Sequence, residues 1–458
     1  MRTTDTSMNN VLSSKGHLRA VFFLGLPLVG SHVAQFSINL TDAVMLGWYG
    51  VEELAAEVLA GTVFFVLFIV GSGFAWAVMP MVAEAESAGD LQRVRRVTRM
   101  GMWLATAFGV LTLPVFVFAT PLLIALGQEP GVSALAGEYL SILGWSIFPA
   151  LLVMVLKSYL AALERTQVVL LITLAGVALN AVLNYALIFG NWGAPELGIR
   201  GAAISSLIGA SASLALLIYY VTRVTPEHDI LARIWHPDWQ AIAEVFRLGW
   251  PIGLTNLAEV GLFAFSSIMM GWLGTVPLAA HGIALQISSL TFMVHLGLSN
   301  AATIRAGQAM GRRDALSLKR GARVVIVLSM LFALLAAALF LTLPEPMIGL
   351  FLSPDDPVRG QVIVLGTGLL AAAALFQLVD AAQVMALGLL RGVQDTRVPM
   401  LIAGFAYWPI GLGMAYFLGF VLDWQGIGVW LGLAIGLTVA GVLMMWRFWR
   451  VSARSLNA

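Results

Sequence analysis

Long apolar runs dominate this 458-residue chain and restrict it to one kind of fold. A helix needs about 20 apolar residues to cross the roughly 30 Å hydrocarbon core of a bilayer. Twelve runs reach that length, and they are continuously apolar, whereas a membrane β-barrel requires alternation. We therefore predict an all-α integral membrane protein with twelve transmembrane helices. The predicted spans are 19–47, 54–80, 97–120, 136–157, 168–190, 199–223, 241–272, 278–304, 322–343, 362–390, 398–422 and 427–449.

Composition excludes several other classes of protein. Hydrophobic residues make up 60% of the chain and charged residues 11%, which is incompatible with folding in water. The chain has no cysteine, so disulfides, thiolate metal sites and thiol catalysis are excluded. No His-Glu-x-x-His metal motif is present, and no paired-aspartate motif of an intramembrane enzyme. We expect a protein that is not an enzyme and that needs no cofactor.

The basic residues predict the orientation of the helices. With a cytoplasmic N-terminus, 23 of the 25 Lys and Arg residues fall at cytoplasmic ends or loops, and only Arg200 and Arg359 do not. This asymmetry predicts that both termini are cytoplasmic, in a bacterial-type inner membrane. The clusters at 93–99 and 305–323 are explained by topology and by contact with anionic membrane lipid. Their loops are too short for nucleic-acid binding.

The two halves of the chain resemble each other. At an offset of 224 residues, 24–61 and 248–285 share 12 of 38 residues, including a Leu-Gly-x-Pro opening and a Leu-Ala-Ala triplet. Six helices, an even number, separate equivalent positions, so we predict two parallel six-helix repeats around a central cleft. The predicted divisions are a cytoplasmic N-terminal tail at 1–18, an N-lobe at 19–223, a cytoplasmic linker at 224–240, a C-lobe at 241–449 and a C-terminal tail at 450–458.

Three acidic residues lie near the middle of predicted spans. They are Asp42, Glu259 and Asp380. A carboxylate in hydrocarbon costs several kcal/mol unless it is neutralised. The stretches around them contain no Lys or Arg at similar depth, so we expect the positive partner to be mobile: a proton, a metal cation or a cationic substrate.

Each predicted lobe surrounds its acids with polar side chains. In the N-lobe, Asn180 and Asn184 lie four residues apart on one helix face, and Ser205 and Ser206 follow on the next helix. Together with Asp42 they form a set of hard oxygens suited to a proton or a sodium ion. In the C-lobe, the neighbours of Glu259 and Asp380 are Thr255, Asn256, Gln377 and Gln383. Two carboxylates in one cavity would exchange protons for a cation, which is an antiport mechanism.

Structural alternatives remain open for these residues. The two asparagines could instead form hydrogen bonds that bridge neighbouring helices. Each of the three acids could instead be protonated and donate a structural hydrogen bond. His32, His281 and His295 suggest a proton relay, but packing is the simpler interpretation. Pro27 and Pro251, at matched positions in the two repeats, are predicted to be either hinges or static kinks.

The chain resembles the multidrug and toxic compound extrusion (MATE) family, particularly its NorM-like branch. The resemblance covers nearly the whole length and is carried by the Leu-Gly-x-Pro segments, Thr41-Asp42-Ala43-Val44-Met45, Glu259, and Asp380-Ala381-Ala382-Gln383-Val384 leading to Leu390-Arg391-Gly392. It implies cation-coupled efflux of cationic, often aromatic, drugs. It also implies that the three acids bind the ion or the substrate, and that Asn180 and Asn184 complete the N-lobe cluster.

Two positions depart from the family pattern. Sodium sites of related proteins have a tyrosine one turn before the aspartate equivalent to Asp380. In this chain that position is Phe376, whose side chain has no oxygen. Some relatives carry an aspartate at the position of Asn184. Both differences remove ligands for sodium, so proton coupling becomes a strong rival.

The expected protein is a monomeric secondary active antiporter. We expect it to export cationic, amphiphilic or aromatic drugs in exchange for protons or sodium ions by alternating access. The residues expected to couple the ion, and to hold sodium if that is the ion, are Asp42, Asn180, Asn184, Glu259 and Asp380. The residues expected to bind substrate are Asn256, Glu259, Asp380 and Gln383. The alternative is a lipid or glycolipid flippase, which would more naturally have a basic cavity.

Overall fold

The computed structural model describes residues 14–353 and 357–452, and this part of the chain forms helices and short turns without a strand. Twelve of its helical segments are long and apolar enough to span a membrane. The predicted tails at 1–18 and 450–458 lie largely outside the described residues. The helices are α1 (Ser14–Tyr49), α2 (Val51–Ser87), α3 (Leu91–Val117), α4 (Ala119–Ala125), α5 (Pro130–Leu143), α6 (Ile147–Ala162), α7 (Thr166–Phe189), α8 (Ile199–Val224), α9 (Trp239–Leu273), α10 (Thr275–Gly311), α11 (Ala315–Thr342), α12 (Pro344–Gly349), α13 (Arg359–Gly392), α14 (Arg397–Phe405), α15 (Gly413–Tyr416) and α16 (Gln425–Arg447).

Each of the twelve predicted spans overlaps one structural span, and most of the helices are longer than predicted. The reason is visible in α2, which continues beyond the predicted end at residue 80 to Ser87 and carries Glu84 and Glu86 in its last turns. A helix does not stop where the hydrocarbon stops, so hydropathy locates the span and not its ends. The eleventh span is irregular: π-helical turns at Ala406–Leu412 and Phe417–Val421 flank α15.

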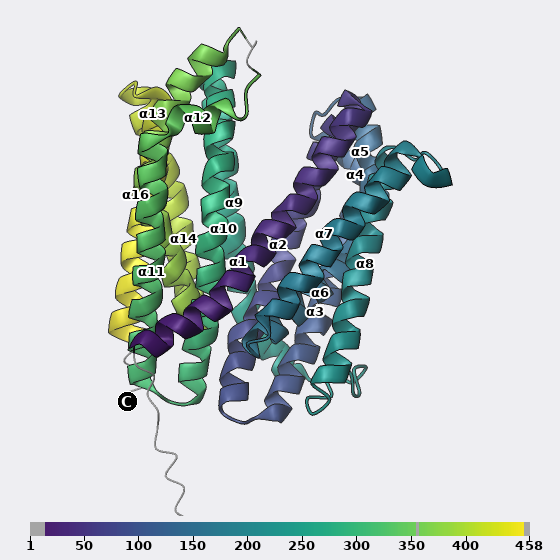
Figure 1. Cartoon of the computed structure of the whole chain (residues 1–458), viewed down its shortest axis with the longest axis vertical. Coiled ribbons are helices and arrows are strands. Elements are labelled where there is room, and N and C mark those ends of the chain that lie inside the picture. The colour runs from purple at the N-terminus through teal and green to yellow at the C-terminus, as the bar shows by residue number, and fades with distance from the viewer. Residues whose placement is uncertain (1–13, 354–356, 453–458) are drawn as a thin grey trace, which may run out of the picture.

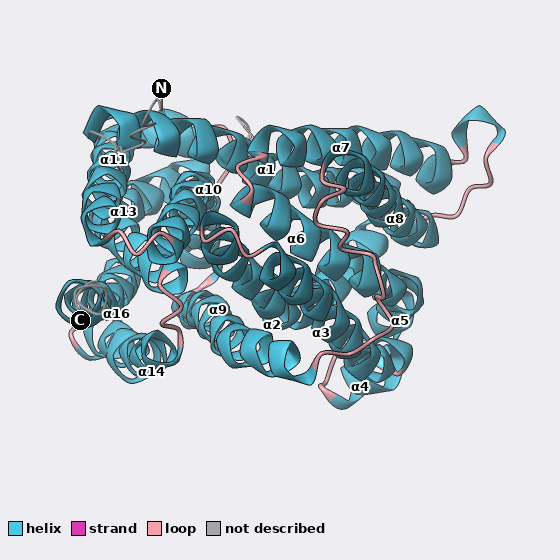
Figure 2. Cartoon of the chain, turned by 90° about the horizontal axis from the view of Figure 1, so that it is seen from below, coloured by secondary structure: helices cyan, strands magenta, loops and turns pink. Residues whose placement is uncertain are grey.

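The helices form two groups. We call α1–α8 the N-lobe and α9–α16 the C-lobe, and we call the end of the bundle where α1 begins and α16 ends the base. Figure 1 shows the two lobes close together at the base and diverging toward the opposite end, with α1 crossing from one side to the other. Seen from below, α2 and α9 lie side by side at the junction (Figure 2). The lobes also meet where α10 packs on α1 and α2.

Glycines allow α2 and α9 to approach closely. A Cβ atom on Gly73 of α2 would lie 2.4 Å from the Gly249 carbonyl oxygen and 2.5 Å from the Gly253 nitrogen of α9. A Cβ on Gly253 would in turn lie 2.5 Å from the Val70 carbonyl oxygen. The obstructing atoms are backbone, so they cannot turn aside as a side chain can. Backbone packs against backbone at this junction, as in small-residue contacts between membrane helices.

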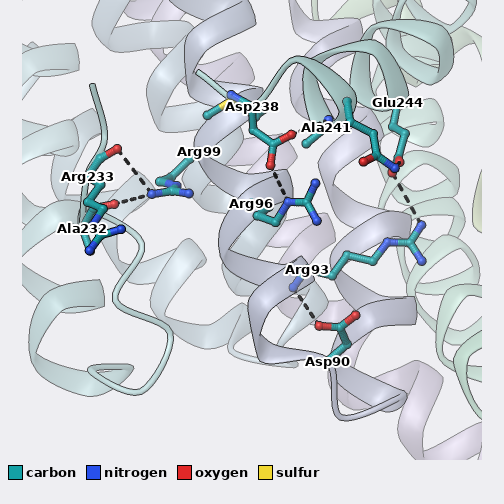
Figure 3. A network of polar contacts seen from close by, with 11 residues as sticks. Asp90, Arg93, Arg96, Arg99, Ala232, Arg233, Asp238, Ala241 and Glu244 are labelled. Atoms are coloured by element: carbon teal, nitrogen blue, oxygen red, sulfur yellow. Dashed lines mark hydrogen bonds and ion pairs between the residues drawn. The ribbon is translucent and has the colours of Figure 1, made fainter. Parts of the chain in front are cut away.

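Charged groups close the base between the lobes. Arg96 of α3 donates to Asp238, which caps α9, at 2.5 Å (Figure 3). Arg93 lies 3.7 Å from Glu84 and 4.0 Å from Glu244 of α9. The Arg96–Asp238 and Arg93–Glu244 pairs join the N-lobe to the start of the C-lobe, whereas Arg93 and Glu84 both belong to the N-lobe.

The Arg96–Asp238 pair predicts a pH-dependent contribution to stability. The hydrogen bond from Arg96 holds the pKa of Asp238 below its usual value of 3.8, so the stability that this pair adds is present near neutral pH and is lost in acid. Both side chains are partly exposed, so an Arg96→Gln variant should lose about 0.2–1 kcal/mol at pH 7. Thermal melts in detergent should show the difference from the unchanged protein shrinking as the pH falls below 3.8. An equal difference at every pH would contradict this role.

Candidate functional site

The N-lobe site centres on Asp42, which is only 5% exposed on α1. Asn184 of α7 donates from Nδ2 to Asp42 Oδ1 at 2.5 Å, and Ser206 of α8 donates from its hydroxyl to Oδ2 at 3.2 Å. Asn180 lies one turn away, with its Oδ1 atom 3.4 Å from the same Asn184 nitrogen. The structure therefore brings together four of the residues expected in this cluster. Ser205, which was also expected there, bonds instead to the Gly201 carbonyl of its own helix.

Two atoms of the N-lobe site have no hydrogen-bond partner within the described residues: Asn180 Nδ2 and Asn184 Oδ1. Buried polar atoms are seldom left unpaired, so these two atoms are candidates to contact an additional ligand. The site offers oxygens from four side chains that can coordinate a small cation. They belong to the Asn180 and Asn184 amides, the Asp42 carboxylate and the Ser206 hydroxyl. The set fits one proton on Asp42 or one hard monovalent cation.

Glu57 of α2 is a neighbour of Asp42 that was not expected from the sequence. It is partly buried and interacts electrostatically with Asp42. One signal for it was present: at the repeat offset of 224 residues, Glu57 is equivalent to His281, which lies in the corresponding part of the C-lobe. A titratable residue at both equivalent positions indicates that each lobe has a polar centre beside its first helix.

The C-lobe site brings Glu259 of α9 and Asp380 of α13 close enough to interact electrostatically. Asp380 is 2% exposed, and its Oδ1 atom has no hydrogen-bond partner in the described part of the chain. Gln383, one turn away, is fully buried and donates from Nε2 to the Tyr407 hydroxyl at 2.6 Å, while its Oε1 atom remains unpaired. Asp380 and Gln383 thus leave two oxygen atoms without a fixed donor.

Arg391 corrects one expectation about this site. The stretch around Glu259 was expected to have no basic neighbour, but Arg391, at the end of α13, is 6% exposed and interacts electrostatically with Glu259. Its guanidinium donates to Asn256 Oδ1 at 2.7 Å and lies 4.9 Å from the centre of the Trp76 ring. The expectation failed because Arg391 follows the predicted span 362–390 by one residue, whereas α13 continues to Gly392. Asn256 is held by this arginine, and Thr255 bonds the Pro251 carbonyl of its own helix.

Phe376 and the histidines fill the interior of the C-lobe. Phe376 is 3% exposed and contacts Phe263 and Trp430 edge to face, with ring centroids 6.0 and 5.5 Å apart. Trp430 donates to His281 Nδ1 at 3.0 Å, so the neutral ring carries its proton on Nε2, which faces the Ser267 hydroxyl at 3.2 Å. This pairing fits the packing interpretation of His281.

The other two histidines also have partners. The His295 Nδ1 atom lies 2.8 Å from the Ser329 hydroxyl, and the His32 Nε2 atom lies 2.9 Å from the Asn300 amide, across the junction of α1 and α10. Pro27 and Pro251 lie inside α1 and α9. Their role as hinges stays a prediction.

A multi-pass membrane protein with a buried acidic centre in each lobe falls in the class of membrane transporters. The MatE family model matches residues 27–186 and 251–417, once in each half of the chain, in agreement with the predicted repeat. The chain belongs to the MATE family.

Relatives with curated names support this assignment along the whole chain. A protein of Rhizobium meliloti named "Probable multidrug resistance protein NorM" is 48% identical over 440 residues, which cover 96% of this chain and 94% of the relative. A protein of Agrobacterium fabrum with the same name is 46% identical and covers 94% of this chain and 93% of its own.

Solved structures share the fold at lower identity. The eukaryotic MATE transporter AtDTX14 superposes with a TM-score of 0.86 at 19% identity, covering 97% of this chain and 99% of that one. A multidrug resistance MATE transporter solved in an outward-facing conformation superposes with a TM-score of 0.85 at 22% identity and covers all of both chains. The predicted fold class is thereby confirmed.

Proposed function

We propose that this protein is a multidrug efflux antiporter that exports cationic, amphiphilic or aromatic compounds in exchange for protons or sodium ions. The names of the NorM relatives support the multidrug part of this proposal. The observation that carries the exchange part is Asp380, a buried carboxylate with an unpaired oxygen beside a second carboxylate, Glu259. Such a pair binds a proton or a cation, because two buried carboxylates that are both ionised and without a counter-ion repel each other and are poorly solvated.

The alternation of access rests on the two lobes. The base is joined by α2–α9 packing and by the Arg93–Glu244 and Arg96–Asp238 ion pairs, while the lobes diverge at the other end. If both termini lie on the cytoplasmic side of a bacterial-type inner membrane, the joined base is the cytoplasmic end and the lobes diverge toward the outside. Rocking of the lobes about their junction would expose the acids to the two sides in turn, with Pro27 and Pro251 as bends in the moving helices.

We propose a role for each residue on the basis of its contacts. Asp42 with Asn180 and Asn184 is proposed to take up the coupling ion in the N-lobe. Glu259 and Asp380 are proposed to exchange that ion against the cationic substrate in the C-lobe. Gln383, through its free oxygen, contributes to substrate binding, whereas Asn256 acts mainly by positioning Arg391. The protein is proposed to work as a monomer without a cofactor. A flippase is disfavoured, because a lipid phosphate would meet two carboxylates.

The coupling ion can be tested directly. We expect ethidium efflux from proteoliposomes to persist in sodium-free buffer and to increase with an imposed proton gradient, because the Phe376 ring supplies no oxygen beside Asp380. The measurement is the initial efflux rate across a pH series with and without sodium. A strict sodium requirement would contradict proton coupling. If neither gradient drives efflux, the antiport proposal itself fails.

A Phe376→Tyr variant provides the matched comparison. It adds one hydroxyl oxygen one turn before Asp380 and changes nothing else. We expect sodium to stimulate this variant more than the unchanged protein, provided that its melting temperature shows that the buried hydroxyl is tolerated.

A further inference from the structure

A polar pocket of about 710 Å³ opens at the base, away from both acidic sites. One wall comes from the N-lobe, where Arg93 and Arg96 project from the first turns of α3 (Figure 3). The other wall comes from the C-lobe, where Arg247 of α9, Arg397 of α14 and Arg447 of α16 line it. This volume lies within the range of small-ligand sites, about 300–1,000 Å³. The pocket therefore has room for a ligand that touches both lobes.

Not every arginine that lines this pocket has an acidic partner. Five arginines and three acidic residues line it, and Asp238 and Glu84 beside it pair with Arg96 and Arg93. Each acid is already engaged: Asp90 caps α3 by accepting from the Arg93 amide at 2.9 Å, Glu244 lies 4.0 Å from Arg93, and Asp395 accepts from Arg447 at 2.7 Å.

Arg247 and Arg397 are the lining arginines for which the described residues supply no acidic partner. Both are exposed, and neither makes a hydrogen bond or ion pair with the described residues. Guanidinium groups bind phosphate oxygens in a two-pronged geometry. These two arginines are thus free to bind an anion.

The start of α14 adds a second, independent feature. The α3 and α9 helices, which also begin at this pocket, are capped by Asp90 and Asp238. The residue before α14, Thr396, does not cap it; its hydroxyl donates to the Leu248 carbonyl at 3.2 Å. The first amides of α14 therefore lack the side-chain acceptor that the other two helices have. Free amides at a helix start favour an anion.

We propose that this pocket binds a phosphate-bearing anion that bridges the lobes and stabilises the joined base. Arg247, Arg397 and the first turn of α14 hold the phosphate from the C-lobe, and Arg93 and Arg96 face it from the N-lobe. Separation of the lobes removes one wall, so the ligand binds the joined state more tightly and shifts the population toward it. The phosphate comes either from a lipid headgroup at the membrane surface or from a free anion in solution.

Spin-label distances across the base test this proposal without reference to transport. The chain has no cysteine, so an Ala88→Cys, Arg312→Cys pair carries the only labels, one on each lobe. The full-length protein is placed in phosphatidylcholine nanodiscs at constant ionic strength. One arm adds phosphatidylglycerol to the nanodisc, and the other adds inorganic pyrophosphate to the buffer, with chloride as the reference. We expect at least one arm to raise the ratio of short to long distances about threefold or more.

Two double variants decide whether the pocket is responsible. Arg247→Gln with Arg397→Gln should abolish the response, and both residues are exposed, so folding should be preserved. Arg165→Gln with Arg223→Gln removes the same charge from exposed arginines outside the pocket and should leave the response intact. A response to phosphatidylglycerol alone assigns the phosphate to lipid, and a response to pyrophosphate alone assigns it to a soluble anion. The proposal is overturned if the unchanged protein responds to neither, or if both double variants behave alike.

Discussion

An Asp380→Asn variant should lose gradient-driven efflux almost completely. Asparagine keeps the shape of the side chain and its packing on α13, where the residue is 2% exposed. It cannot bind or release a proton, and it cannot neutralise a cation. The unpaired oxygen of Asp380 and its electrostatic interaction with Glu259 make this residue the centre of the proposed exchange. We expect the initial rate of ethidium efflux to fall roughly 100-fold, which corresponds to about 2.7 kcal/mol.

An Asp423→Asn variant is the matched control for this experiment. Asp423 is an exposed residue between the last two spans, and its φ of 55° is a conformation that asparagine also adopts. The same chemical change should leave efflux unaltered there. Normal efflux by Asp380→Asn would remove the residue from the mechanism. Asp42→Asn and Glu259→Gln, measured beside it, show which lobe couples the ion.

A Gly73→Ala variant should disrupt the joined base. The added methyl group would lie 2.4 Å from the Gly249 carbonyl oxygen, so α2 and α9 would have to separate by about 1 Å to reach ordinary contact. Overpacking of this kind costs about 1–3 kcal/mol. Each 1.4 kcal/mol shifts a conformational equilibrium about tenfold. We expect the base to open and efflux to fall about tenfold or more, because the state with the joined base becomes less populated.

The same label pair at positions 88 and 312 measures this opening. A second pair, Gln128→Cys with Leu350→Cys, reports on the opposite end of the bundle and should shorten as the base lengthens. Gly282→Ala on α10 is the control, since a Cβ there meets nothing within 4 Å. If Gly73→Ala leaves both distances unchanged, the glycine contact does not set the conformational balance.

The span count and the acidic residues could be predicted because both depend on local physics. The thickness of the hydrocarbon core sets the length of every apolar run, whatever the helix packs against. A carboxyl group in such a run is unfavourable however the helices pack, so Asp42, Glu259 and Asp380 can be recognised from the sequence alone. Helical spacing of four residues was enough to place Asn180 and Asn184 on one face.

Contacts between spans could not be predicted in the same way. Ser205 and Ser206 were equally good candidates, and only the rotation of α8 decided that Ser206 reaches Asp42. Arg391 follows the predicted span 362–390 by one residue, and hydropathy gives neither the end of the helix nor the direction in which that side chain turns. Glu57 was missed because nothing in its own segment indicates that α2 passes beside Asp42.

The sequence by itself determined a duplicated twelve-helix membrane protein with unpaired acids in both halves, since segment length, repeat and desolvation are properties of neighbouring residues. The tertiary structure alone decided which oxygens surround each acid, that Arg391 accompanies Glu259, and that five arginines from four helices line one pocket at the base. Those features depend on the rotation of each helix and on packing between residues more than one hundred positions apart, which side-chain periodicity does not encode.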